Sequence, residues 1–319
     1  MWLVVWRSGW HTVWSAVEPE LKQRADDPDR VGATFGVGFD ETVMNSATRR
    51  RRCRYITAAV DTATGQVIDV FDGRDANDLH KWVSAQPRGW RQNIRVVCCD
   101  PHEGYRKAIR ALIAQGLLPA GTRLATDPFH IVRLANQAIT RARQRTQQQT
   151  TGHRGRKGDP LYGIRKLLLM AAERLDPRGW QRLHQALKAG DPCDEVLECW
   201  QAKEQTRSIF KTTNPQTAVQ RLDDTIAYCS DPDAPPELQA LAGTLNRWHT
   251  ETITSVATAT TNARTEAANA KIKDIKRKAR GYTNIGNYRL RILVATGHKP
   301  HQNTPTTRIR THKTPLKRE

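Results

Sequence analysis

The spacing of hydrophobic residues changes along the chain from helical to strand-like and back again. Trp10, Val13, Trp14 and Val17 fall at helical spacing, which predicts a helix within residues 9–25. Short apolar or alternating runs then predict strands at residues 34–40, 54–73, 93–100 and 122–127, and helical periods occupy residues 75–87, 101–117 and 128–145. The run at 54–73 is interrupted by the turn DTATGQ and is expected to form a hairpin.

Three of the predicted strands end in an aspartate: Asp40, Asp100 and Asp127. Ligands of open α/β sheets sit outside the carboxyl ends of the strands, so these residues are candidates for a common site. Asp100 and Asp127 are each followed by proline, and an aspartate N-cap followed by proline would explain either one structurally. Asp40 has no proline behind it and is followed by a second acid, Glu41.

From about residue 141 to 260 the pattern becomes entirely helical. A polar, basic stretch at 140–160 opens it, and helical periods follow at 161–175, 180–187, 194–210, 218–229 and 237–253. A last helical stretch, from residue 261 to 293, carries Glu266 at its head. Glu266 has an alternative interpretation as a favourable first-turn acid, close to Asn262 or Thr265 as the cap.

The charge of the chain favours a polyanionic partner. It has 51 Lys and Arg against 32 Asp and Glu, a net charge of +19, and residues 264–319 alone contain 15 of the basic residues and 3 of the acidic ones. Nucleic acid is the expected partner, and the family resemblance described below implies double-stranded DNA. The basic residues expected to bind it are Lys271, Lys273, Lys276, Arg277, Lys278, Arg280, Arg289 and Arg291. The polar residues 298–319 are predicted to be a disordered basic tail.

The cysteines and the hydropathy exclude other classes. None of the six cysteines forms a CxxC pair, so no zinc site and no disulfide framework is predicted. No apolar run is long enough to span a membrane, and a reduced, cytoplasmic location is expected.

Several carboxylates at one sheet edge repel one another unless a hard cation binds them. Mg²⁺ suits such a site, and Mn²⁺ is expected to substitute for it. Two ions about 3.5–4 Å apart can activate an attacking oxygen and stabilise a leaving one. An acid heading a basic helix fits a phosphodiester substrate, since the acid would bind the metal and the basic turns the flanking phosphates. Asn269 and Lys273 share the helical face of Glu266.

The order of these elements resembles an RNase H-like core, and several segments resemble the ISL-three family of bacterial DDE transposases. These segments are VGFDE (37–41), RYITAAVDTATGQV (54–67), CCDPHEGYRKAI (98–109), TDPFHIVRLAN (126–136), TTGHRGRKGDPLYGIRKLLL (150–169) and residues 261–293. They occur in family order. The resemblance implies an RNase H-like mixed sheet with flanking helices, interrupted by a large all-helical insertion.

The resemblance also assigns residues and divides the chain. It implies that Asp40, Asp100 and Glu266 form the catalytic, metal-binding triad, with Asp127, His130 and Asn269 as accessory residues. The expected domains are a helix-turn-helix remnant (1–30), the first part of the core (31–140), a helical insertion (141–260) and the final core helices (261–297).

Some segments differ from the family pattern. Members of the family usually begin with a zinc-binding module and a complete helix-turn-helix, whereas no cysteine precedes Cys53 here. The family loop of the GFRNF type is GYTNI in this chain. We therefore expect mostly non-specific binding to duplex DNA, with a dissociation constant of about 10⁻⁴ to 10⁻⁶ M.

The resemblance implies Mg²⁺-dependent cleavage of transposon ends and their transfer to target DNA by a homo-oligomer associated with the nucleoid. Two alternatives remain open: a catalytically inactive or truncated DNA-binding relic, and an RNase H-like nuclease. The helical insertion and the basic last helix count against the nuclease.

Overall fold

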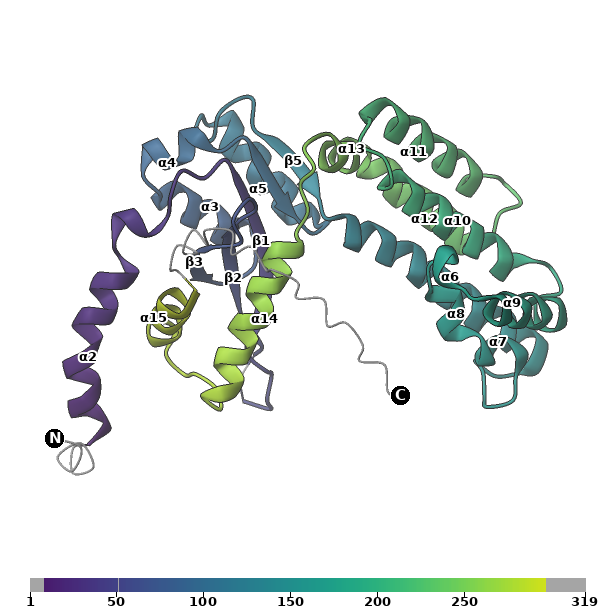
Figure 1. Ribbon diagram of the computed structural model, residues 1–319, viewed down its shortest axis with the longest axis horizontal. Coiled ribbons are helices and arrows are strands. Elements are labelled where there is room, and N and C mark those ends of the chain that lie inside the picture. Colours follow the sequence, from purple (N-terminus) through teal and green to yellow (C-terminus); the bar gives the residue numbers. More distant parts are fainter. Residues whose placement is uncertain (1–8, 51, 297–319) are drawn as a thin grey trace, which may run out of the picture.

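The computed structural model describes residues 9–50 and 52–296 and contains a five-stranded sheet beside a group of helices (Figure 1). The sheet has the order β3-β2-β1-β4-β5, in which β1, β2 and β3 are antiparallel neighbours and β4 and β5 run parallel to β1. The strands are β1 (Gly36–Asn45), β2 (Arg54–Asp61), β3 (Val67–Asp72), β4 (Val96–Cys99) and β5 (Arg123–Thr126). This is the predicted mixed α/β fold, with the predicted hairpin and with β5 beside β4.

Helices cover both faces of the sheet, because side chains alternate between the faces along each strand. On one face, Val37 and Phe39 of β1 pack with Trp82 and Ile109. The helices there are α3 (Ala76–Ala85), α4 (Arg88–Asn93) and α5 (Glu103–Ala114). On the other face, Ile56 and Val70 pack against the final helices α14 (Ala263–Lys278) and α15 (Ile285–Thr296). The sheet is therefore the middle layer of three.

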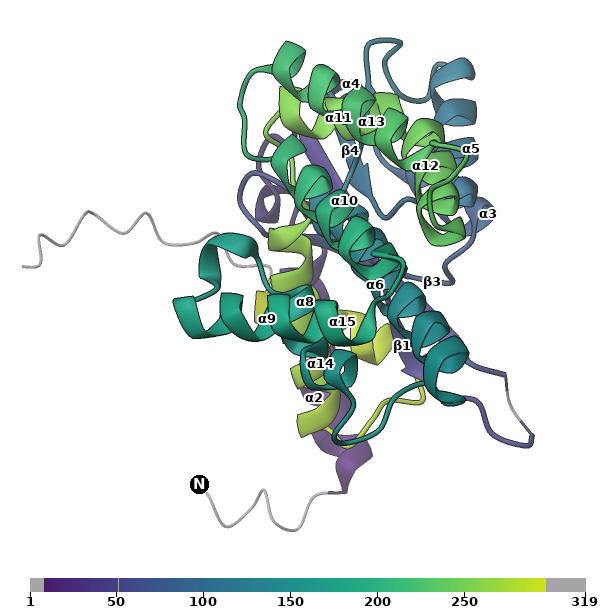
Figure 2. The same ribbon diagram turned by 90° about the vertical axis from the view of Figure 1, so that its right-hand side faces the viewer.

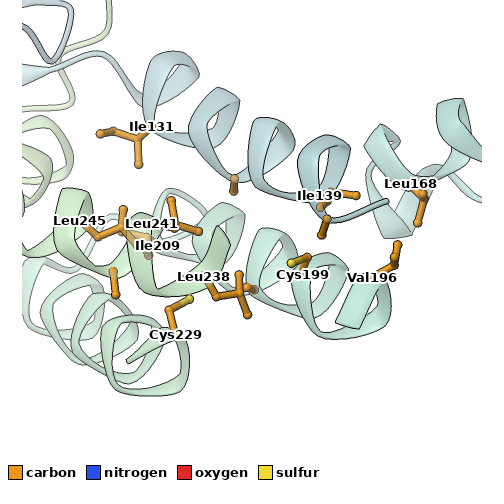
Figure 3. Close-up of a cluster of buried hydrophobic side chains, with 14 of the residues drawn as sticks. Ile131, Ile139, Leu168, Val196, Cys199, Ile209, Cys229, Leu238, Leu241 and Leu245 are labelled. Atoms are coloured by element: carbon orange, nitrogen blue, oxygen red, sulfur yellow. The ribbon is translucent and has the colours of Figure 1, made fainter. Parts of the chain in front are cut away.

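The helical part has a separate hydrophobic core (Figure 3). The long helix α6 (Pro128–Thr151) leads from the sheet into it, and α10 and α12 pack along α6. The other helices of this part are α7 (Pro160–Gly163), α8 (Arg165–Leu169), α9 (Pro177–Gly190), α10 (Glu195–Ile209), α11 (Pro215–Cys229), α12 (Pro236–Arg247) and α13 (His249–Ala257), with the 3₁₀ turn η2 (Ala172–Arg174) before α9. A second 3₁₀ turn, η1 (Pro28–Arg30), precedes β1. Because α6 runs without a break through residue 140, the division of the chain into domains stays a prediction.

Several elements differ from the sequence prediction. Helix α4 was not predicted, and the last helical stretch is divided into α14 and α15. Strand β1 does not end at Asp40 but continues to Asn45, because it pairs with β2 along its length. Helix α6 continues through the polar stretch to Thr151, since Gln and Arg are good helix formers, and it ends at Gly152, which has a left-handed φ of 75°. Residues 161–175 form α7, α8 and η2 instead of one helix, and residues 237–253 break at the buried Trp248 into α12 and α13.

The first described helix, α2 (Trp10–Ala25), packs against α15 of the core. Ala25 is buried in the same cluster as Ile292, and Asp26 lies 3.5 Å from a guanidinium nitrogen of Arg289. Its role in a helix-turn-helix stays a prediction. The predicted tail at 298–319 lies outside the described residues. None of the described helices is long and apolar enough to cross a membrane.

Replacing Ile272 with Ala should destabilise the protein by about 2–5 kcal/mol, because the side chain is fully buried between α14, the sheet and α15. Denaturant unfolding would measure the change. The control is Lys271→Ala on the next, exposed position, which should change the free energy of unfolding by less than about 0.5 kcal/mol. Equal destabilisation of the two variants would contradict this account of how α14 is held.

Candidate active site

The parallel strands β4 and β5 bring Asp100 and Asp127 to the same edge of the sheet, as their positions directly after the two strands predict. The alternative explanation of these residues as helix caps holds for the position of Asp127 but not for Asp100. The N-cap of α5 is His102, so Asp100 does not cap it. Asp127 is the N-cap of α6, but its side chain makes no capping hydrogen bond. The carboxylates are directed to other partners.

His130, one turn into α6, lies between these two carboxylates. Its Nδ1 is 2.9 Å from Oδ2 of Asp127 and its Nε2 is 2.9 Å from Oδ2 of Asp100. Burial alone would lower the pKa of His130, but the hydrogen bonds to Asp100 and Asp127 outweigh it and raise the pKa to about 10. The two aspartates therefore favour the imidazolium form of His130, in which each ring N–H donates a hydrogen bond to one carboxylate.

Asp127 also holds the beginning of α14. Its Oδ1 accepts a hydrogen bond from the backbone N–H of Asn262 at 3.1 Å. The same segment lies against β1 at Gly38, where an added Cβ would be only 2.2 Å from Oγ1 of Thr265 and 2.7 Å from Oδ1 of Asn262. Glycine at position 38 thus allows the close approach that places Glu266 near the strand ends.

Asp40 projects from the middle of β1 and is fixed by α14. Its Oδ2 accepts a hydrogen bond of 2.6 Å from Nδ2 of Asn269, one turn after Glu266 on the helix. Burial raises the pKa of Asp40, the hydrogen bond from Asn269 lowers it, and the charge of Asp100 raises it again, with a net upward shift. Asn269 therefore orients a carboxylate that stands near another carboxylate.

The side chains that could bind metal form two adjoining groups. Each residue offers one ligand atom, and within each group these atoms all lie within 4.8 Å of one another. Asp40, Glu41 and Asp100 form the first group, and Asp127, His130 and Glu266 form the second. In the second group His130 could bind a metal only after it loses a proton, because an imidazolium has no free lone pair. The structure thus brings Asp40 and Asp100 together and places Glu266 beside the two predicted accessory residues. His130 joins the groups through its bond to Asp100.

Electrostatic coupling extends across both groups. The pKa of Glu266 is raised, first by burial and then by the charge of Asp127, with smaller contributions from Asp40 and Asp100 against the lowering effect of His130. The predicted triad therefore shares one electrostatic environment although its three carboxylates do not form a single group.

Glu41 is a candidate ligand that the sequence did not identify as one. Burial raises the pKa of its carboxyl, and the charges of Asp100 and Asp40 raise it further. The signal in the sequence was its position directly after Asp40. On an ideal strand, however, adjacent side chains point to opposite faces, so the strand pattern argued against placing both acids in one site.

The donor set suits a divalent cation with a preference for oxygen. Within the described residues, Oδ1 of Asp100 and Oδ1 of Asn269 are buried and have no hydrogen-bond partner. Buried polar oxygens are normally paired, so these two atoms are available to a ligand. A bound cation would also offset the repulsion that raises the pKa values of Asp40, Glu41 and Glu266.

The predicted DNA-binding residues have different environments. Lys271, Lys273, Arg280 and Arg291 are exposed and form no ion pair within the described chain. Asp274 pairs with Arg277 and Lys278, and Nζ of Lys276 donates to the carbonyl of Val43 at 2.8 Å. Arg289 is half-buried and binds Asp69 at 2.5 Å, so it serves the packing of α15 on the sheet.

Adding Mg²⁺ or Mn²⁺ should raise the melting temperature of the wild-type protein, since a ligand at 100 times its dissociation constant stabilises the folded state by about 2.7 kcal/mol. Asp100→Asn should abolish this rise while leaving the metal-free protein folded, because the substitution removes a repelling charge. The control is Asp233→Asn, an exposed acid in the loop before α12. A full metal-induced shift in Asp100→Asn would contradict the assignment of Asp100 as a ligand.

The chain matches one family of known proteins. The family model for transposases of the DDE, ISL-three type matches residues 37–292, which is most of the 319-residue chain. No curated protein matches the chain. Among solved structures, the chain resembles a Drosophila P element transposase strand transfer complex at 12% identity, with a TM-score of 0.44, over 90% of this chain and 80% of that one. The family match spans both carboxylate groups, and the chain belongs to the ISL-three family of DDE transposases.

Proposed function

We propose that this protein cuts DNA at the ends of an insertion sequence and joins the freed 3′-hydroxyl to target DNA with the help of divalent metal ions. The observation that supports the proposal is that Asp40 on β1 and Asp100 after β4 lie in one carboxylate group and Glu266 on α14 lies in the adjoining one, although these elements are far apart in the sequence. Family membership supports a DNA-cutting enzyme. The choice of Mg²⁺, with Mn²⁺ as a substitute, follows from the oxygen donors.

The residues of the site would mainly position and orient. Asp40 and Asp100 would hold the cation, with Glu266 or Glu41 completing the set. Metal ions at such a site supply an activated attacking oxygen and stabilise the leaving one. Asn269 fixes the carboxylate of Asp40, and His130 fixes those of Asp100 and Asp127. In-line attack at phosphorus depends on this positioning and on charge stabilisation more than on covalent chemistry.

The basic helix α14 would hold the DNA next to the cut phosphate. Lys271 and Lys273 follow Glu266 by about one and two turns and are exposed. Cations in these positions would bind phosphates that flank the scissile one, and this explains an acid at the head of a basic helix. Two DNA ends must be joined in one reaction, so we also propose that a homo-oligomer acts on the DNA.

A strand-transfer assay tests the proposal. The substrate would be a duplex that carries the inverted repeat flanking the coding sequence, and the target a supercoiled plasmid. With Mg²⁺ or Mn²⁺ the wild type should form joint products. Asp40→Asn and Asp100→Asn should each reduce the rate by at least about 10²–10³-fold, the typical loss when a group that stabilises the transition state is removed.

Two further variants distinguish the candidates for the third carboxylate. Glu266→Gln should abolish joining, whereas Glu41→Gln should retain a measurable rate. The reverse pattern would assign the role to Glu41. Full activity in both aspartate variants, measured beside the Asp233→Asn control, would reject the catalytic proposal and favour a protein that only binds DNA.

A further inference from the structure

The helical part of the molecule is electrically divided along its sequence. Residues 133–188 contain 13 Lys and Arg against 3 Asp and Glu, whereas residues 189–260 contain 5 against 11. Neither half has a role in the proposed chemistry. A difference in net charge of this size indicates that the two sequence halves have different roles toward charged partners.

Eleven cations of the basic half are exposed without an ion pair among the described residues, and five of them lie on α6 or in the loop that follows it. We call this set the α6 ridge; it consists of Arg133, Arg141, Arg154, Arg156 and Lys157. Arg145 on the same helix shows the contrast, because Glu195 and Glu237 pair with it at 2.9 and 2.8 Å. Arg145 is thus neutralised by carboxylates within the fold, whereas the five cations of the ridge are not.

The ridge begins on the free face of α6. Ile131, Ala135 and Ile139 face the helical core, and Arg133 lies roughly opposite to them around the helix. A groove of about 430 Å³ lies along this helix, between Arg141 and Arg154, with Gln144 and Gln148 in its walls. Arginine and glutamine side chains donate hydrogen bonds of the kind that phosphate oxygens accept.

The loop at residues 152–159 carries Arg154, Arg156 and Lys157 of the ridge, and its backbone conformation is restrained. Gly152, Gly155 and Gly158 have φ values of 75°, 114° and 107°, which favour glycine. Beneath the loop, Arg143 and Gln147 are buried at 5% and 2% exposure, and they bond to each other.

Backbone and buried side chains fix this loop. Arg143 donates to the carbonyl of Arg154 at 3.4 Å, and Oδ2 of Asp159 accepts from the backbone N–H of Arg156 at 2.6 Å. The loop is thus anchored through its main chain, which leaves the side chains of Arg154, Arg156 and Lys157 available to bind a ligand.

Helix α6 runs from the sheet, against which α14 packs, to α7 and α8. In Figure 1, α14 lies on one side and α7, α8 and α9 on the other, with α6 between them above. Figure 2 is turned by 90° and shows α8 and α9 in front of α14 and α15, so the two groups stand opposite each other. The 24 residues of α6 make it about 36 Å long, which matches one turn of duplex DNA at about 34–36 Å.

We propose that the α6 ridge is a second DNA-binding surface, which begins beside the candidate active site at Arg133 and whose far end, Arg154, Arg156 and Lys157, contacts phosphates of a duplex about one helical turn from that site. The inference rests on the proposed function for the position of the cut phosphate. Duplex DNA fits because the surface offers cations and amides at a spacing set by a rigid helix, and because a protein partner would be expected to require apolar contacts as well.

The test is the salt dependence of binding to a 30-base-pair duplex without metal, so that no cleavage occurs. The ridge variant combines Arg154→Ala, Arg156→Ala and Lys157→Ala, which keep the backbone contacts of the loop. Each phosphate contact contributes a slope of about −0.9 in log K against log salt, so the slope should become shallower by about 2.7. Between 50 and 200 mM salt, the affinity of the wild type should then fall about 40-fold more than that of the variant.

The matched control combines Lys81→Ala, Arg88→Ala and Lys107→Ala. These three exposed cations form no ion pair within the described residues, and they lie on α3, α4 and α5, across the sheet from α14. This control has the same net charge as the ridge variant and should keep the wild-type slope. Because a partly misfolded sample lowers the active fraction but not the slope, the comparison is insensitive to folding. Equal slopes in the ridge variant and the control would overturn the proposal.

Phosphate ethylation interference gives the position. Ethylation of a phosphate weakens binding only when the protein contacts that phosphate. One set of phosphates should therefore interfere with binding of the wild type but not of the ridge variant. A second set should interfere with binding of the wild type but not of the double variant Lys271→Ala, Lys273→Ala. These two sets of phosphates should lie about ten base pairs apart on the duplex. Identical sets for the two variants would contradict the geometry.

The inference and the proposed function can fail separately. Strand transfer by a ridge variant with an unchanged slope would reject this inference alone. A changed slope in the ridge variant, together with no cleavage by the wild type, would reject the proposed function alone.

Discussion

The hydrogen bond from the backbone N–H of Asn262 to the carboxylate of Asp127 joins two segments that are 135 residues apart in the sequence. The residues between them form α6, the helices that follow it and their connecting loops, so this contact returns the chain to the sheet at the place where it left. Asp127 is almost fully buried, and its second oxygen binds His130. The site depends on this closure because it sets where α14 begins, and thus where Glu266 and Asn269 lie.

The candidate site is held at an electrostatic cost. Burial and mutual repulsion raise the pKa values of Asp40, Glu41 and Glu266 together. The imidazolium of His130 offsets part of this repulsion for Asp100 and Asp127. Carboxylates that would be more stable apart are kept together by the sheet and by α14, and such an arrangement is typical of a site that a cation completes.

The two basic surfaces differ in the way they are built. On α14, several predicted DNA-binding residues also serve the fold: Asp274 pairs with two of them and Lys276 bonds to β1. On the α6 ridge the structural role belongs to buried groups, Arg143 and Gln147, and the exposed cations pair with no carboxylate of the described chain. The charge of α14 is the more concentrated along the sequence, although a smaller fraction of it is available to bind DNA.

Local periodicity was enough to predict most of the separate strands and helices. Apolar runs followed by acids predicted β4 and β5 with Asp100 and Asp127, and the parallel arrangement that brings them together follows from the order of elements. Polar composition misled at residues 140–151, because exposed Gln and Arg continue a helix as readily as they form a loop.

The grouping of the carboxylates, in contrast, could be read only from the folded chain. Local sequence does not reveal that Glu41 and Asp100 approach each other, that His130 bridges two strand ends, or that Glu266 lies with Asp127 rather than within one tight triad. These contacts join segments separated by tens to hundreds of residues. They depend on the packing of α14 over Gly38, a close approach between distant backbones that no periodicity or spacing along the chain encodes.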